Sequence, residues 1–272
     1  MPRLSVLGDD TDIKNKRAIL GWCFYDWANS AFATSGTVAI IPVYFVLLFQ
    51  QEFGQQTEIL GLNVTASSVW SLLIALSAMV VALTSPVLGV IADRLVIRKA
   101  LVTVYTLAGA GFTFLLFFSA YTGSSWMWIA GCFLLANIGF AGGNVFYNAL
   151  LPHLVSNEDM DSVSSKGFAY GYVGGGLLLA IHLAILFYYS GSDFEDFATR
   201  ACIASIGVWW FGWAIVSYRL VPEPGVRLKD RELVRSVVKV AAVQVVRTLR
   251  DITRFRALAF YLLTYLLFND AI

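Results

Sequence analysis

The sequence predicts an all-α polytopic membrane protein built around a bundle of six transmembrane helices. Its 272 residues are 58% hydrophobic and only 14% charged, whereas about 25% of the residues in soluble domains are charged. The apolar residues gather into runs of the length that crosses a bilayer, and the basic residues are distributed very unequally between the loops. The net charge of +1 gives no overall basic surface, so no nucleic-acid partner is expected.

Six apolar runs reach the roughly 20 residues that a transmembrane helix needs. They fall near residues 18–49, 67–92, 100–121, 126–151, 167–190 and 200–221. The first run is longer than a straight crossing requires, and Pro42 is expected to kink or end it near its far side. A seventh run opens at Ala257 and is still apolar at Ile272. We therefore expect a tail over 1–17, a bundle over 18–221, a linker over 222–256 and the start of a seventh helix over 257–272.

The basic residues indicate the orientation. Of the 19 Lys and Arg residues, all but Arg200 lie in the N-terminal tail, after the second and fourth spans, or around the connection after the sixth. Cytoplasmic loops carry such an excess, so the N-terminus is predicted to be cytoplasmic. The expected location is the bacterial inner membrane, or the vacuolar membrane in a eukaryotic cell.

The connection over 222–256 begins with Pro222-Glu223-Pro224-Gly225 and continues as a stretch in which apolar and basic residues alternate in a helical pattern. Such a pattern predicts an amphipathic cytoplasmic helix. It is interpreted either as a solvated or membrane-skimming linker or as a regulatory, lipid-binding element.

Two acidic residues fall inside apolar runs, Asp26 in the first and Asp270 in the seventh. Intramembrane carboxyl groups are costly and are functional candidates. Helical spacing places Asp26 on one stripe with Asn29, Ser30 and Thr37, next to Tyr25. Asp26 is therefore a candidate proton relay or counter-ion for an amine substrate. The alternative is a structural carboxylate paired at the cytoplasmic base of the bundle.

The fourth span carries Asn137, Asn144 and Asn148 on one helical face. These amides are expected either to contact a polar substrate or to bond across helices. Small residues that would allow close helix contact are Gly139, Gly143, Gly171 and Gly175. No strand precedes the glycines of the fifth span, so a phosphate-binding loop is not indicated.

Residues 89–99 (Gly-Val-Ile-Ala-Asp-Arg-Leu-Val-Ile-Arg-Lys) resemble the cytoplasmic signature between the second and third helices of the major facilitator superfamily. The resemblance implies a charged cytoplasmic gate. Its residues would be Gly89, Asp93, Arg94, Arg98 and Lys99. Val96 and Ile97 replace the usual glycine and arginine, and Arg98-Lys99 arrives one position late.

Further segments sharpen the resemblance: residues 21–32, above all 25–30 (Tyr-Asp-Trp-Ala-Asn-Ser), with 147–152, 163–167, 174–176 and 268–270. They are similar to the superfamily branch that contains the autophagy-related vacuolar amino-acid effluxers and their bacterial relatives. The resemblance implies a secondary active transporter with two six-helix bundles, the second missing from this chain. A small solute, with amino acids and efflux suspected, would be the substrate.

Other functions fit less well. The only histidines are His153 and His182, and neither H-E-x-x-H nor G-x-S-x-G occurs, so an enzyme, a metal site or a cofactor is not predicted. A non-transporting seven-helix receptor or scaffold remains the alternative, although an N-terminus inside the cell and a seventh run without lysine argue against it. The expected partners are a small-molecule substrate, the lipid bilayer and the C-terminal half of the same transporter.

Overall fold

A computed structural model describes residues 6–59 and 61–223, together with Val243, Phe260 and Thr264. The chain separates into two compact units, residues 1–82 with 98–224 and residues 83–97 with 225–272. The predicted linker and seventh span, with Asp270, therefore lie almost entirely outside the described residues.

The described residues are almost wholly helical, as predicted. The main helices are α1 (Val6–Ala31), α2 (Ile41–Phe53), α3 (Ala66–Leu95), α4 (Arg98–Leu115), α5 (Ser125–Asn148), α6 (Met160–Tyr189) and α7 (Glu195–Leu220). Short helices are the π-helix η1 (Phe32–Ile40) and the 3-10 helices η2 (Leu116–Tyr121) and η3 (Leu151–His153). In this part of the chain, six helical stretches are long and apolar enough to cross a membrane: Lys16–Phe53, Ala66–Leu95, Arg98–Tyr121, Ser125–His153, Met160–Tyr189 and Glu195–Leu220. The six predicted spans are confirmed.

The first span is interrupted by a π-helix that directly precedes Pro42. The backbone N–H of Ile41 donates to the Gly36 carbonyl, five residues back. Proline has no N–H and its ring crowds the carbonyl four residues earlier, so a wider turn accommodates it. The α-helical period therefore does not extend to Thr37, whose hydroxyl donates to the Phe32 carbonyl at 3.3 Å. The polar stripe predicted from spacing ends at Ser30.

A small β-hairpin joins the first two spans and was not expected. β1 (Thr57–Ile59) pairs antiparallel with β2 (Leu62–Val64). Gly61 in the turn has φ +78°, a conformation that glycine adopts without steric cost.

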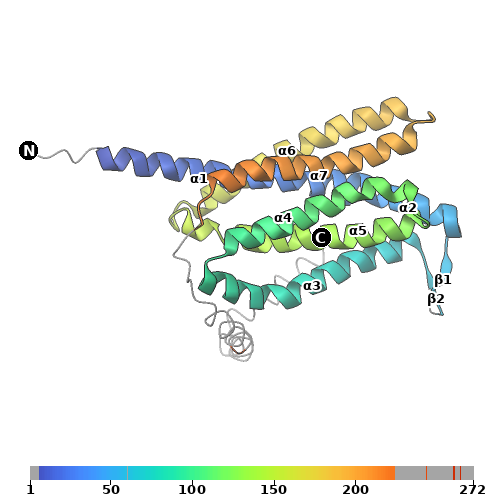
Figure 1. The fold of residues 1–272 in the computed structure, drawn as a ribbon, viewed down its shortest axis with the longest axis horizontal. Helices are drawn as coiled ribbons and strands as arrows, with labels where there is room; N and C mark the ends of the chain where they lie inside the picture. The colour runs from blue at the N-terminus through green and yellow to red at the C-terminus, as the bar shows by residue number, and fades with distance from the viewer. Residues whose placement is uncertain (1–5, 60, 224–242, 244–259, 261–263, 265–272) are drawn as a thin grey trace, which may run out of the picture. The chain divides into compact units, whose positions relative to one another are not determined.

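In the unit formed by residues 1–82 and 98–224, α1 packs against α6 and α7, and α4 packs against α5 and α7 (Figure 1). The rings of Phe32, Phe133 and Trp210 are fully buried where η1, α5 and α7 meet. The backbones of α4 and α5 touch at Gly109 and Gly139, because a methyl group at position 139 would lie 2.5 Å from the Gly109 Cα.

Residues 83–97, in the other unit, include the C-terminal end of α3. The Ile97 N–H donates to the Ala92 carbonyl at 3.1 Å, and Val96 between them has φ 54°. This is the Schellman arrangement, in which the left-handed residue is usually glycine. The backbone thus keeps a glycine-like turn although the sequence places a β-branched residue there, at a steric cost.

Replacing Val96 with Gly is therefore expected to raise the free energy of unfolding by about 1 kcal/mol. Thermal unfolding of the detergent-solubilised protein measures the change. Leu95→Gly is the matched control and should lower the melting temperature, because it places glycine inside the helix. A melting temperature lowered equally by both changes would contradict the strain at Val96.

Candidate functional site

Two of the segments noted in the sequence, around residues 22–30 and 147–150, pack directly against each other. The Trp22 indole N–H donates to the Tyr147 carbonyl at 3.2 Å, and the Tyr147 hydroxyl donates to the Trp22 carbonyl at 3.1 Å. The rings of Trp22 and Tyr147 stack with their centroids 4.4 Å apart. The Tyr25 ring also stacks on the Tyr147 ring, with a centroid distance of 4.6 Å. This reciprocal pairing fixes the N-terminal part of the first span against the end of α5.

Asp26 lies on α1, half-buried, beside α6. The Tyr147 hydroxyl lies near this carboxyl group and donates its hydrogen to the Trp22 carbonyl. A methyl group at position 167 would lie 2.7 Å from Oδ2 of Asp26 and would collide with the Trp22 ring. Gly167 therefore provides the space that the Asp26 carboxyl group occupies, a role that spacing along α1 alone did not reveal.

Asn29 and Ser30 contact different helices. The Asn29 amide donates to Oδ1 of Asn144 on α5 at 2.6 Å. A methyl group at position 171 would lie 2.5 Å from the Ser30 hydroxyl, and one at position 175 would lie 2.9 Å from the Ser30 carbonyl oxygen. The polar residues of α1 thus lie at two helix contacts, toward α5 and toward α6.

The three asparagines of α5 do not share one surface. Asn137 is buried and donates to the Ser77 hydroxyl of α3 at 2.5 Å. Asn144 pairs with Asn29, and Asn148 is exposed. Two of the three amides therefore bond across helices, the second of the two uses considered for them.

Tyr25 is directed toward α4 rather than α6. Its hydroxyl is buried and lies 3.2 Å from the Thr106 hydroxyl. A methyl group at position 143 would lie 2.6 Å from the Tyr25 oxygen, so Gly143 leaves room for this contact. Tyr25 and Asp26 are neighbours in sequence, but their side chains belong to different helix contacts.

The residues predicted to form a gate are divided between the two units. Gly89 has open space beside it, and Asp93 and Arg94 are exposed at the end of α3. In the other unit, the backbone N–H of Lys99 donates to the Glu223 carboxylate at 3.1 and 3.2 Å. The Lys99 ammonium lies 4.1 Å from the centre of the Tyr218 ring. The start of α4 is thus connected to the end of α7, which the loop signature did not indicate.

A second polar cluster, in which a buried arginine meets an exposed carboxylate, lies at the opposite end of the spans and was missed in the sequence. Arg200 is 6% exposed; its Nε donates to Asp196 at 2.8 Å and its Nη1 donates to the Phe117 carbonyl at 3.1 Å. The Tyr44 hydroxyl donates to the other Asp196 oxygen at 2.7 Å. Asp196 lies in the first turn of α7. Its spacing of four residues from Arg200 was the available signal.

Comparison with known proteins agrees with these features. Residues 14–272 match the sequence model of the family described as "Vacuole effluxer Atg22 like". The chain belongs to the Atg22-like vacuole effluxer family. The resemblance inferred from residues 25–30 and the other segments is therefore confirmed.

A curated relative is longer than this chain. The "Uncharacterized MFS-type transporter YxiO" of Bacillus subtilis (strain 168) is 28% identical over 254 residues, which are 92% of this chain and 56% of the relative. The chain spans about half the length of this curated relative. No solved structure matches the chain. The Atg22-like chain is thus a multi-pass membrane protein with transporter relatives.

Proposed function

We propose that the full-length protein is a secondary active transporter of a small solute, working by alternating access, and that this chain supplies its first six-helix bundle. The Asp26 carboxyl group carries the proposal. It is half-buried inside the first span, next to the Tyr147 hydroxyl and against Gly167. Burying a carboxyl group within a membrane costs free energy, so its presence there favours a functional role. The family description supports efflux as the direction. The suitability of a carboxyl group for binding an amine supports amino acids as the substrate.

Transport by the full-length protein in proteoliposomes tests the proposal. We expect gradient-driven flux of at least one member of an amino-acid panel, measured in both directions, and loss of accumulation when a protonophore collapses the pH gradient. Residues 1–272 alone should give no flux, because alternating access needs one bundle to move against another. Flux no greater than in empty liposomes across the panel would refute the amino-acid assignment.

The cytoplasmic gate that we propose for residues 89–99 makes a separate prediction. Asp93→Asn should change the rate of conformational exchange while substrate affinity stays within about threefold of the wild type, because a gate acts on the equilibrium between states and not on the solute. Exchange rates and equilibrium binding are measured on the same preparation. Asp161→Asn, another exposed acid, is the control. Complete loss of equilibrium binding in Asp93→Asn would assign this residue to the binding site instead.

The cytoplasmic N-terminus and the bacterial inner membrane are also proposals, supported by the distribution of Lys and Arg. Reporters fused after Asp193 and after Arg227 should report opposite sides of the membrane. The same side for both would refute the topology.

A further inference from the structure

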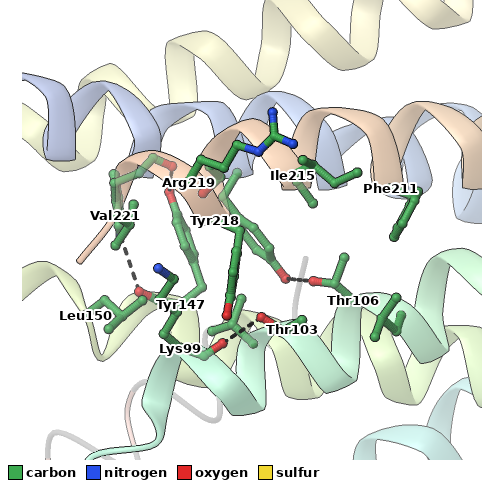
Figure 2. A pocket seen from close by; sticks show the side chains of 16 residues that line it. Lys99, Thr103, Thr106, Tyr147, Leu150, Phe211, Ile215, Tyr218, Arg219 and Val221 are labelled. Carbon is green, nitrogen blue, oxygen red and sulfur yellow. Dashed lines mark hydrogen bonds between the residues drawn. The ribbon is translucent and has the colours of Figure 1, made fainter. Parts of the chain in front are cut away.

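A cavity of about 260 Å³ lies between α4 and α7 and is distinct from the contact of Asp26 with α6 (Figure 2). Its walls come mainly from two helices, and Trp22, Tyr25 and Tyr147 contribute from α1 and α5. From α4 the walls include Lys99, Thr103, Thr106 and Leu107, and from α7 they include Phe211 and Arg219.

The lining of the cavity is mostly apolar, and four of its six hydroxyl groups are engaged in hydrogen bonds. The Thr103 hydroxyl donates to the Lys99 carbonyl at 2.9 Å, and the Thr106 hydroxyl is bonded to Tyr25. The Tyr147 hydroxyl is bonded to Trp22. A polar solute in this cavity would lose most of its hydrogen bonds to water without replacing them, which costs several kcal/mol. The cavity therefore suits a hydrocarbon chain.

The cavity opens at the outer surface of α4 and α7, two of the membrane-crossing helices. Large apolar side chains at the rim are exposed: Leu107 is 52% and Phe211 44% exposed. Within a bilayer such side chains contact acyl chains. A volume of about 260 Å³ is below the roughly 300 Å³ at which pockets begin to hold whole drug-sized ligands, so the cavity fits part of a lipid.

One end of the cavity carries positive charge. Lys99, in the first turn of α4, lines it, and Arg219 lies at the same end in the last turn of α7. In Figure 2 the Arg219 guanidinium points away from α4, so Lys99 supplies the charge on the α4 side. Glu223 offsets one of the two charges and is engaged by the Lys99 backbone N–H. Because the Arg219 guanidinium is directed away, Lys99 is the cation that lines the α4 side of this end.

We propose that this cavity binds one acyl chain of an anionic phospholipid of the cytoplasmic leaflet, with the lipid phosphate beside Lys99. Basic pockets between transmembrane helices on the cytoplasmic side bind anionic head groups. The site rests on the proposed orientation of the spans but not on the identity of the transported solute. It would link the start of α4 to the end of α7 through a lipid as well as through Glu223.

Native mass spectrometry of the full-length protein tests the head group, with phosphatidylglycerol and phosphatidylethanolamine of identical chains as probes. Lys99→Gln should weaken phosphatidylglycerol binding about fivefold, the effect of one lysine near an anionic lipid. The matched control Lys166→Gln removes an exposed lysine of α6 that does not line the cavity, and should leave binding unchanged. Equal binding of the two lipids by the wild type, or equal effects of the two lysine variants, would overturn the proposal.

A second pair of variants tests the cavity itself. Leu107→Trp should fill it and reduce phosphatidylglycerol binding, whereas Leu135→Trp, at a similarly exposed position on α5 that does not line the cavity, should not. Phosphatidylglycerol binding that is equal in these two variants would show that lipid adheres elsewhere. Because the readout is lipid binding and not flux, failure here is distinguishable from failure of the transport proposal.

Discussion

Asp26→Asn is expected to abolish pH-gradient-driven accumulation while the protein still folds and inserts into the membrane. Asparagine has the shape of a protonated carboxyl group but cannot titrate, so only the proton exchange is removed. The carboxyl group packs over Gly167, near the Tyr147 hydroxyl, and an amide of the same size fits the same space. Accumulation in proteoliposomes should fall to the level of empty liposomes, and exchange without a gradient should persist.

The control for this change is Asp161→Asn, an exposed acid in the first turn of α6, which should keep full accumulation. Size-exclusion profiles and melting temperatures of both variants establish folding. If Asp26→Asn unfolds the protein in detergent, Asp26 is a structural carboxylate. Unchanged pH-dependent transport would equally exclude the coupling role.

Gly139→Ala is expected to destabilise the bundle by about 1–3 kcal/mol, the usual cost of overpacking. The added methyl group would lie 2.5 Å from the Gly109 Cα and 2.8 Å from the Tyr105 carbonyl oxygen. Both neighbours are helix backbone, so no rotamer change relieves the contact, and α4 and α5 must move apart. Thermal unfolding in detergent should show a lowered melting temperature.

Gly131→Ala is the matched control, because it makes the same substitution on the same helix where no atom lies within 4 Å of the added methyl group. Alanine favours a helix over glycine by about 1 kcal/mol, so this variant should be neutral or slightly stabilised. Equal melting temperatures for the two variants would show that the close approach at Gly139 does not limit stability.

The spans could be predicted because lipid allows few alternatives. A backbone in hydrocarbon must satisfy its own hydrogen bonds, so an apolar run of about 20 residues becomes a helix. The run predicted at 126–151 corresponds to the observed stretch Ser125–His153. The hairpin over β1 and β2 lies outside the apolar runs, where this constraint does not apply, and it was missed.

The sequence by itself determined the number and order of the spans, the family and the presence of a carboxyl group within the first span. Only the tertiary structure decided the neighbours: Asn29 with Asn144, Asn137 with Ser77, and Asp26 with Gly167. Helical periodicity gives the direction of a side chain on its own helix, and even that fails beyond a π-helix such as η1. Which helix lies opposite depends on the packing of segments more than a hundred residues apart, such as Asn29 and Asn144, and no local pattern records it.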